Sequence, residues 1–194
     1  MSAAMSLPES GMSVLASVIA WAFDAEAPVR AGEDQVSVPG SGSRVLIAGD
    51  AFDRAAVVKI VNRLGPCSTA WLRTTYGDRC DWDADQSLTT YCWGLWYPEQ
   101  PPMRGDTVKK AKGLMYLALQ EQRRICRGHP AAYKPAQVCE LLGVAADNYR
   151  QHWKCRWHQM LQDFEVIDGL AMDDFRVAMM ANPDLMRRLG MYLW

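Results

Sequence analysis

Apolar residues recur at intervals of three and four along most of this chain, which is the spacing of one face of an α-helix. The longest such segment is Arg104–Arg127, where a single apolar stripe continues over several turns. Gly and Pro residues stand between these segments, where they end helices. No segment alternates apolar and polar residues strongly enough to predict a sheet. The pattern therefore predicts an all-α fold, a multi-helix domain.

The pattern also predicts where each element begins and ends. Residues 25–44 are rich in Gly, Ser, Pro and acids, which predicts a flexible linker, and Val45–Ile47 is a short extended piece. Most of the tryptophans fall within or beside helices, so we expect them to be core residues: Trp71, Trp82, Trp93, Trp96, Trp153 and Trp157. The predicted helices are Met12–Asp24, Ala51–Leu64 after a cap at Asp50, Ser68–Tyr76, a helix from a cap at Asp81, Asp83 or Asp85 to about Tyr97, Arg104–Arg127, Pro135–Leu142, Ala145–Asp163 or longer, Met172–Met180, and a short last helix from Asn182-Pro183.

Positive charge is concentrated in the second half of the chain. Residues 103–159 hold eleven Lys and Arg against four Asp and Glu, a net charge of +7, whereas the remainder carries ten against eighteen, a net charge of −8. Such an asymmetry indicates an anionic partner for the basic part. The alternative is a solvated basic face, or one that pairs with the acids elsewhere in the chain.

One stretch inside the basic part, Pro135–Arg156, has the spacing of a helix-turn-helix. Cys139 is the small residue needed where the two helices cross, Gly143 tolerates the left-handed backbone of the tight turn, and Val144 is the apolar residue that follows it. Pro135 suits a first helical turn. The remaining apolar positions complete a small core: Val138, Leu141, Leu142, and Tyr149 with Trp153 or His152. An ordinary helical corner is the alternative, because Leu-Leu-Gly-Val also occurs there.

The polar face of the second helix predicts contacts with double-stranded DNA. Arg150 and Gln151 carry the groups that bind guanine and adenine bidentately in the major groove. Asp147 disfavours binding to arbitrary sequences, because a carboxylate repels phosphate. The predicted DNA-binding residues, phosphate contacts included, are Ala146, Asp147, Arg150, Gln151, Lys154, Arg156 and Lys134.

The segment Gln137–Trp153 resembles the helix-turn-helix of sigma-factor region 4. The order of parts resembles phage antitermination proteins of the Q type: an N-terminal helix with a Trp, a helix ending in Arg-Leu (Ala51–Leu64), a helix ending in Tyr-Gly (Trp71–Gly77) and a C-terminal sigma-like reader. The resemblance implies regulation of late genes, with a specific DNA site and bacterial RNA polymerase as partners. It leaves Asp78–Pro130 without a counterpart.

The sequence thus divides into residues 1–44 (N-terminal helix and linker), 45–130 (helical body), 131–165 (helix-turn-helix region) and 166–194 (C-terminal extension). A protein-interaction module is the alternative function. The C-terminal methionines would form its contact surface or the interface of a homo-oligomer. The alternative is that they only close the core. These residues are Met172, Met179, Met180, Met186 and Met191.

Other classes of function find little support in the sequence. No phosphate-binding or nucleophile motif is present, so we expect no enzymatic activity and no cofactor. Cys126 and His129 form one Cys-x2-His pair, whereas a structural zinc site usually has two close pairs, so no metal site is expected. The apolar Gly11–Phe23 is too short for a membrane span and has no basic residue before it. A cytoplasmic protein without disulfides is therefore predicted.

Overall fold

The computed structural model describes residues 14–24, 49–77 and 81–191. These residues form helices joined by short turns and contain no strand, which confirms the predicted all-α fold. The predicted linker and the extended piece at Val45–Ile47 lie outside the described residues. The elements are α1 (Val14–Phe23), α2 (Gly49–Val61), α3 (Pro66–Thr75), α4 (Trp82–Trp96), the 3₁₀ turn η1 (Tyr97–Glu99), α5 (Gly105–Cys126), α6 (Pro135–Leu142), α7 (Ala146–Asn148), the π-helical turn η2 (Tyr149–Trp153), α8 (Lys154–Met180) and α9 (Pro183–Arg188).

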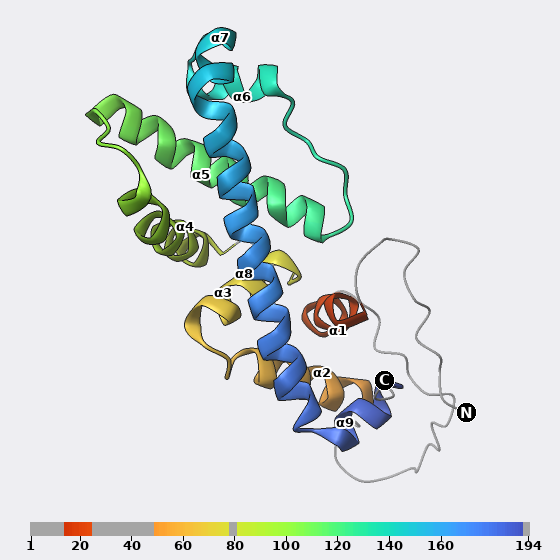
Figure 1. The fold of residues 1–194 in the computed structure, drawn as a ribbon. Coiled ribbons are helices and arrows are strands. Elements are labelled where there is room, and N and C mark those ends of the chain that lie inside the picture. Colours follow the sequence, from red (N-terminus) through yellow and green to blue (C-terminus); the bar gives the residue numbers. More distant parts are fainter. Residues whose placement is uncertain (1–13, 25–48, 78–80, 192–194) are drawn as a thin grey trace, which may run out of the picture.

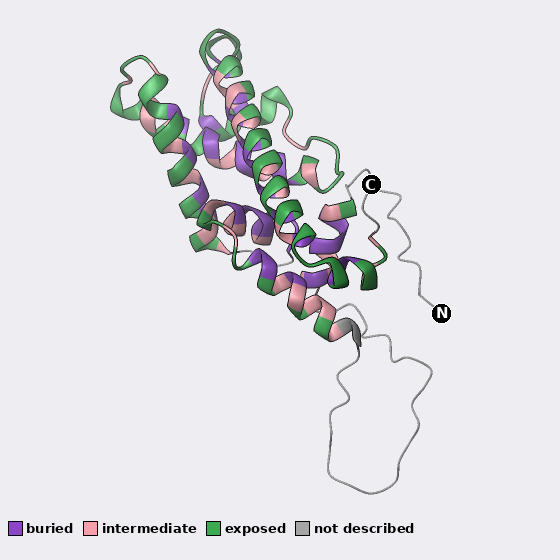
Figure 2. Ribbon diagram, turned by 60° about the horizontal axis from the view of Figure 1, so that its bottom comes forward, coloured by how far each residue is buried: buried purple, intermediate pink, exposed green. Residues whose placement is uncertain are grey.

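Helix α8 is the central element, and α3 and α5 pack most extensively against it (Figure 1). Buried residues gather where the helices face one another, and exposed residues follow their outer sides (Figure 2). Core residues of α8 recur every three or four positions: Trp157, Met160, Phe164, Ile167, Ala171, Phe175 and Met179. This stripe joins the two ends of the molecule through one continuous core.

The sequence predicted a break between Asp163 and Met172, and this prediction was wrong. Helix α8 runs unbroken through this segment because Gly169 keeps helical geometry and Ile167 and Ala171 continue the buried stripe. The expected boundary between residues 165 and 166 falls inside α8. The helix-turn-helix and the C-terminal extension therefore share a single helix.

Polar side chains fix α3 against α8 at defined positions. The Asp168 carboxylate accepts hydrogen bonds from Trp71 Nε1 at 2.7 Å and from the Tyr76 hydroxyl at 2.8 Å. Ser68 Oγ donates to Asp174 one and a half turns further along α8, at 2.6 Å. Because the buried Trp71 ring also stacks on Phe164, with centroids 5.8 Å apart, apolar packing and hydrogen bonding specify the same alignment of α3.

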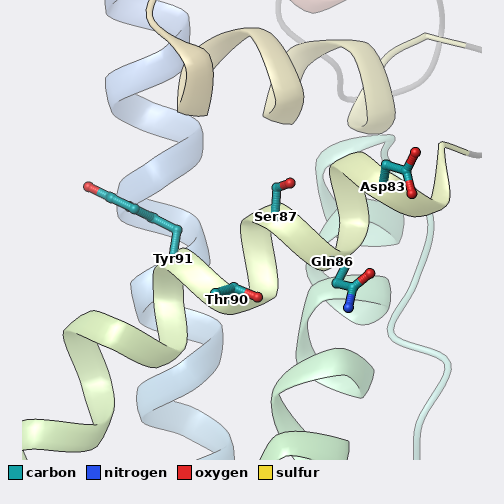
Figure 3. A pocket seen from close by; sticks show the side chains of 5 residues that line it. All are labelled: Asp83, Gln86, Ser87, Thr90 and Tyr91. Atoms are coloured by element: carbon teal, nitrogen blue, oxygen red, sulfur yellow. The ribbon is translucent and has the colours of Figure 1, made fainter.

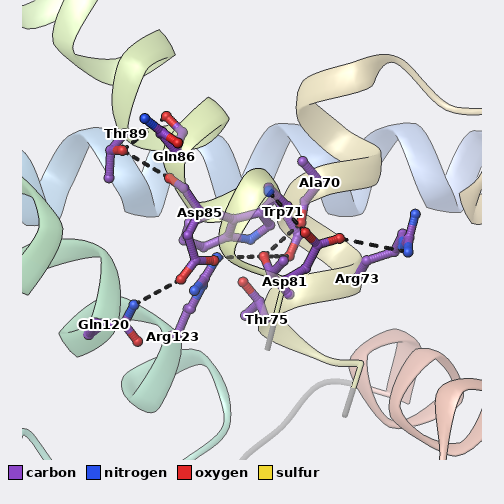
Figure 4. A network of polar contacts seen from close by, with 12 residues as sticks. Ala70, Trp71, Arg73, Thr75, Asp81, Asp85, Gln86, Thr89, Gln120 and Arg123 are labelled. Carbon is purple, nitrogen blue, oxygen red and sulfur yellow. Dashed lines mark hydrogen bonds and ion pairs between the residues drawn. The ribbon is translucent and has the colours of Figure 1, made fainter. Parts of the chain in front are cut away.

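A buried ion pair joins α4 to α5 (Figure 4). Arg123 Nη2 lies 2.6 Å from Asp85 Oδ1 and donates to Thr74 Oγ1 of α3 at 2.6 Å. The other oxygen of Asp85 accepts from Gln120 Nε2 at 3.2 Å. Helix α4 begins at the N-cap Asp81, one of the three predicted caps, which accepts from the backbone N–H of Ala84 at 3.1 Å.

The expectation that tryptophans are core residues holds for Trp71, Trp96, Trp153 and Trp157, which are all buried. Trp93 is half-buried, and Trp82 is an exception because 62% of it is exposed on the outer side of α4. Among the described residues, no helix is both long and apolar enough to cross a membrane.

The buried ion pair gives a stability prediction. Replacing Arg123 by Met leaves the Asp85 carboxylate buried without its cation, so we expect the free energy of unfolding to fall by about 3–5 kcal/mol in urea titrations followed by circular dichroism. Arg187→Met is the matched control, because Arg187 and Asp184 form an exposed pair at 3.3 Å, and its effect should stay below about 0.5 kcal/mol. Similar losses in both variants would contradict the assignment.

Candidate nucleic-acid interface

The stretch predicted as a helix-turn-helix folds as α6 and the helical segment that begins with α7, joined by a turn at Gly143. Gly143 has φ of 59° and ψ of 48°, the left-handed geometry that the sequence predicted. The backbone N–H of Val144 donates to the carbonyl of Cys139 at 3.0 Å, and that of Gly143 donates to Glu140 at 3.1 Å. These two bonds are those of a Schellman motif, which ends α6 and sends the chain sharply into the next helix.

A small apolar core fixes the angle between the two helices. Val138, Leu142, Tyr149 and Trp153 are buried, as the spacing predicted. Leu141 was expected in this core and is instead exposed, so that prediction was wrong. In an eight-residue helix the positions i and i+4, Val138 and Leu142, face the core together, and Leu141 then points elsewhere.

Helix α5, which belongs to the body of the protein, holds the turn in place. Lys110 Nζ donates to the carbonyl oxygen of Gly143 at 3.0 Å. The buried Glu121 carboxylate accepts from the backbone N–H groups of Ala132 and Tyr133, at 2.9 and 3.1 Å, and so fixes the connection that leads into α6. Neither role was predicted, because side-chain bonds to backbone groups far along the chain leave no mark in local spacing.

The second helix changes geometry after one turn. Tyr149–Trp153 is a π-helical turn between α7 and α8, and its backbone continues directly into the central helix. The Trp153 ring donates from Nε1 to Asn148 Oδ1 at 2.8 Å, which stabilises the turn from inside. Such turns are rare and often occur at functional sites. The proposed reading segment is thus the free end of a helix that is anchored in the core (Figure 1).

The structure brings most of the predicted DNA-binding side chains to one surface. Ala146, Asp147, Arg150, Gln151 and Lys154 are all exposed on this segment. Asp147 and Arg150 form an ion pair at 3.2 Å in which both side chains are largely solvated, 83% and 70% exposed.

Two of the predicted phosphate contacts stand apart from that group. Lys134 is exposed at the start of α6, where its backbone N–H donates to Gln137 Oε1 at 2.9 Å. Arg156 is half-buried, with its guanidinium 5.1 Å from the centre of the Trp153 ring. His152, which was weighed as a core anchor, is exposed beside Gln151.

Part of the basic excess is engaged in holding the fold together. Arg123 is buried against Asp85, and Arg127 donates to the carbonyls of Thr74, Thr75 and Gly77 at the C-terminal end of α3. The simple charge count therefore overstated what is available to an anionic partner.

The Cys126 thiol is poorly suited to binding a metal. Burial raises its pKa to about 12, with the nearby Asp168 carboxylate acting in the same direction, so the thiolate that zinc requires is disfavoured. Its sulfur accepts from Gln122 Nε2 at 3.7 Å, while His129 is exposed. Within the described part of the chain, no three His, Cys, Asp or Glu side chains converge on a metal site.

Comparison with known proteins finds one family that matches most of this chain. Residues 33–179, well over half of the chain, match the family described as phage antitermination protein Q. The chain belongs to the phage antitermination protein Q family. The match includes residues 78–130, for which the sequence resemblance had no counterpart, and it extends from before α2 to near the end of α8.

A curated relative of this Q-family chain is antitermination protein Q of Enterobacteria phage 82. The two are 24% identical over 132 residues, which cover 67% of this chain and 57% of the relative. The chain therefore spans little more than half the length of that relative. No solved structure matches.

The turn itself gives the second prediction. Gly143→Ala places a Cβ on a left-handed residue, so we expect a loss of about 1–2 kcal/mol in the free energy of unfolding measured in urea. An added Cβ meets no atom within 4 Å at this position, so the loss reports backbone geometry alone. Gly169→Ala in the middle of α8 meets equally open space at a helical φ and should stabilise by about 0.5–1 kcal/mol. The same sign of effect at both glycines would count against the turn geometry.

Proposed function

We propose that this Q-family protein is a sequence-specific DNA-binding regulator that acts as an antiterminator of transcription by bacterial RNA polymerase. The observation that carries the DNA-binding part is the helix-turn-helix at the free end of α8, with its polar side chains exposed. The name of the phage 82 relative supports the antitermination part. Such a protein works in the bacterial cytoplasm, and regulation of this kind needs no enzymatic chemistry.

The reading segment enters the major groove of the duplex with the face that carries Arg150 and Gln151. Arg150 binds a guanine edge and Gln151 an adenine edge, while Lys154 and Lys134 contact phosphates and set the position of the segment. The Schellman turn supports this assignment, because it keeps α6 from covering the exposed face of the second helix.

Asp147 gives the segment a means of discrimination. Without DNA, its carboxylate pairs with Arg150 in solvent, where such a pair contributes little to stability. On a matching site Arg150 turns to a base, and the favourable base contact offsets the repulsion between Asp147 and nearby phosphates. On other sequences only the repulsion remains. The pair therefore weakens binding to arbitrary duplexes more than binding to the specific site.

An antiterminator also needs a surface for the polymerase, and α8 offers one. Its outer side carries an exposed apolar row spaced by three to seven residues: Val166, Leu170, Val177 and Met180. Of the C-terminal methionines that were considered for this role, Met179 and Met186 are buried in the core, Met172 and Met191 are half-buried, and Met180 is exposed. A second copy of this chain is the alternative occupant of the row. Sedimentation with and without polymerase distinguishes the two.

The experiment that tests the proposal begins with selection of bound sequences from a random duplex pool. The selected site is then placed downstream of a promoter and before a terminator, in transcription reactions with purified bacterial RNA polymerase. We expect the protein to enrich one sequence and to increase read-through only on templates that carry it. Failure to enrich any sequence would overturn the DNA-reading role.

Replacing Arg150 and Gln151 together by Ala should remove the preference for the selected site. We expect a loss of about 1–3 kcal/mol for each base contact, measured by fluorescence anisotropy on the selected duplex, with a much smaller loss on a random duplex. Arg187→Ala and Arg176→Ala, at exposed positions far from the reading segment, are the controls.

The phosphate contacts are tested by salt. Log affinity for the selected duplex should fall with log salt by about 0.9 per contact, and Lys154→Ala should lower this slope by about one contact on all sequences alike.

Equal losses on specific and random duplexes for the Arg150 and Gln151 replacement would show that these side chains do not read bases.

A further inference from the structure

The outer face of α4 has two adjoining hollows that the helix-turn-helix does not use. Gln86 and Thr90 line both. Figure 3 shows the first, a shallow hollow of about 560 Å³, with side chains spaced along α4 from Asp83 to Tyr91: Asp83, Gln86, Ser87, Thr90 and Tyr91. The second, about 250 Å³, lies between α4 and α5 and is lined by Gln86, Thr89, Thr90, Trp93, Lys112 and Met115. Because they share Gln86 and Thr90, the two hollows adjoin, and this shallow surface on α4 and α5 is called the α4 groove below.

Aromatic rings stand at both ends of this groove. Trp82 is tilted against Tyr116 of α5, with ring centroids 5.8 Å apart, and most of its surface is exposed. At the other end Trp93 stacks on Tyr97 at 4.9 Å. The two tryptophans are separated by eleven positions on one helix, or roughly 16 Å at about 1.5 Å per residue.

Three aromatic rings on α4 and the turn that follows it are exposed, while Trp93 is half-buried. Trp71 and Trp96 fill the core and are almost fully buried, whereas Trp82, Tyr91 and Tyr97 leave large apolar areas in water. Exposed aromatic groups gathered over one helix are typical of a binding surface.

The charges of the groove favour an anionic occupant at one end. Lys112 Nζ lies 5.4 Å from the centre of the Trp93 ring, and Lys109 is exposed one turn earlier on the same face of α5. Asp83 is the carboxylate at the opposite end. Between the ends, the exposed side chains of Gln86 and Thr90 offer amide and hydroxyl groups to a polar ligand.

We propose that this groove binds a single strand of nucleic acid. The exposed rings of Trp82, Tyr91 and Tyr97 give unpaired bases a surface to stack on, and Lys109 and Lys112 bind the backbone phosphates. Gln86 and Thr90 lie where they contact base edges, and Asp83 accepts from exocyclic amino groups. A duplex does not fit this chemistry, because its base faces are covered by stacking on one another. The groove thus takes a different form of nucleic acid from the helix-turn-helix, and neither proposal depends on the other.

The test uses fluorescein-labelled mixed-sequence 15-nucleotide strands, one of DNA and one of RNA, and the full-length protein at 0.1 M salt. Anisotropy should show binding of at least one strand, and Trp82→Ala should weaken it about tenfold, since stacking contributes roughly 1–3 kcal/mol per base. Phe52→Ala is the matched control, because Phe52 is 63% exposed on α2, far from the groove. The difference between the two strands tells which nucleic acid the groove prefers.

Charge is tested separately. Lys112→Gln should lower the slope of log affinity against log salt by about 0.7, the contribution of one phosphate on a single strand, whereas Lys59→Gln on α2 should leave it unchanged. The Arg150 and Gln151 replacement should retain single-strand binding, so failure of one nucleic-acid surface is distinguishable from failure of the other.

Three results would overturn the proposal. One is no binding of either strand, and another is equal binding by the Trp82→Ala and Phe52→Ala variants. The third is binding of a glutamate-rich peptide with the same dependence on Trp82 and Lys112 when neither strand binds. That result would assign the groove to an acidic protein segment.

Discussion

The structure depends on the continuous helical segment that begins at α7, passes through the π-helical turn η2 and ends with α8. One stretch of this helix is held in the core by Asp168, which accepts from Trp71 and Tyr76, and by the stack of Trp71 on Phe164. The other end carries the proposed reading segment. Because a helix resists bending, the orientation imposed at Asp168 is transmitted along α8 and the π-helical turn to Arg150, which lies 18 residues earlier in the chain. The helix-turn-helix is therefore an extension of the core and not a separately hinged module.

Helix α5 provides the second constraint on the structure, because one side of it contacts the turn at Gly143 and another side contacts α4. Lys110 reaches the carbonyl of Gly143, while Lys112, two positions on and so on a different face, lies over Trp93 of α4. Glu121 then fixes the connection into α6. A displacement of α5 would move the turn and the α4 groove together, so both surfaces share one support.

The sequence predicted those parts of the fold that local chemistry determines. Pro and Gly end most helices near the expected residues, and Gly143 is left-handed because the turn needs it. The false break in α8 has a physical cause: exposed Val166 and Leu170 obscure the buried stripe, and a glycine inside a well-packed helix costs too little to end it. The burial predicted for Leu141 and Trp82 was wrong because the spacing of apolar residues defines the buried face of a helix only approximately. Within the candidate site, the exposure of Arg150, Gln151 and Lys154 was predictable, but the contacts of Lys110 and Glu121 were not, since both depend on tertiary structure.

The contacts of the basic residues show that their number alone overstates the positive charge that a ligand can meet. Residues 103–159 carry a net +7, yet Arg123 and Arg127 stabilise the fold through Asp85 and the carbonyls that end α3. Of the remaining cations, Arg150 and Lys154 are exposed near the N-terminal end of α8, whereas Lys109 and Lys112 are exposed on α5, with Lys112 over Trp93 of α4. A single basic face would attract any polyanion without distinguishing its form. Two smaller groups, one on the exposed end of a helix and one beside exposed rings, instead suit the proposed duplex and single-strand sites, which differ in their chemistry.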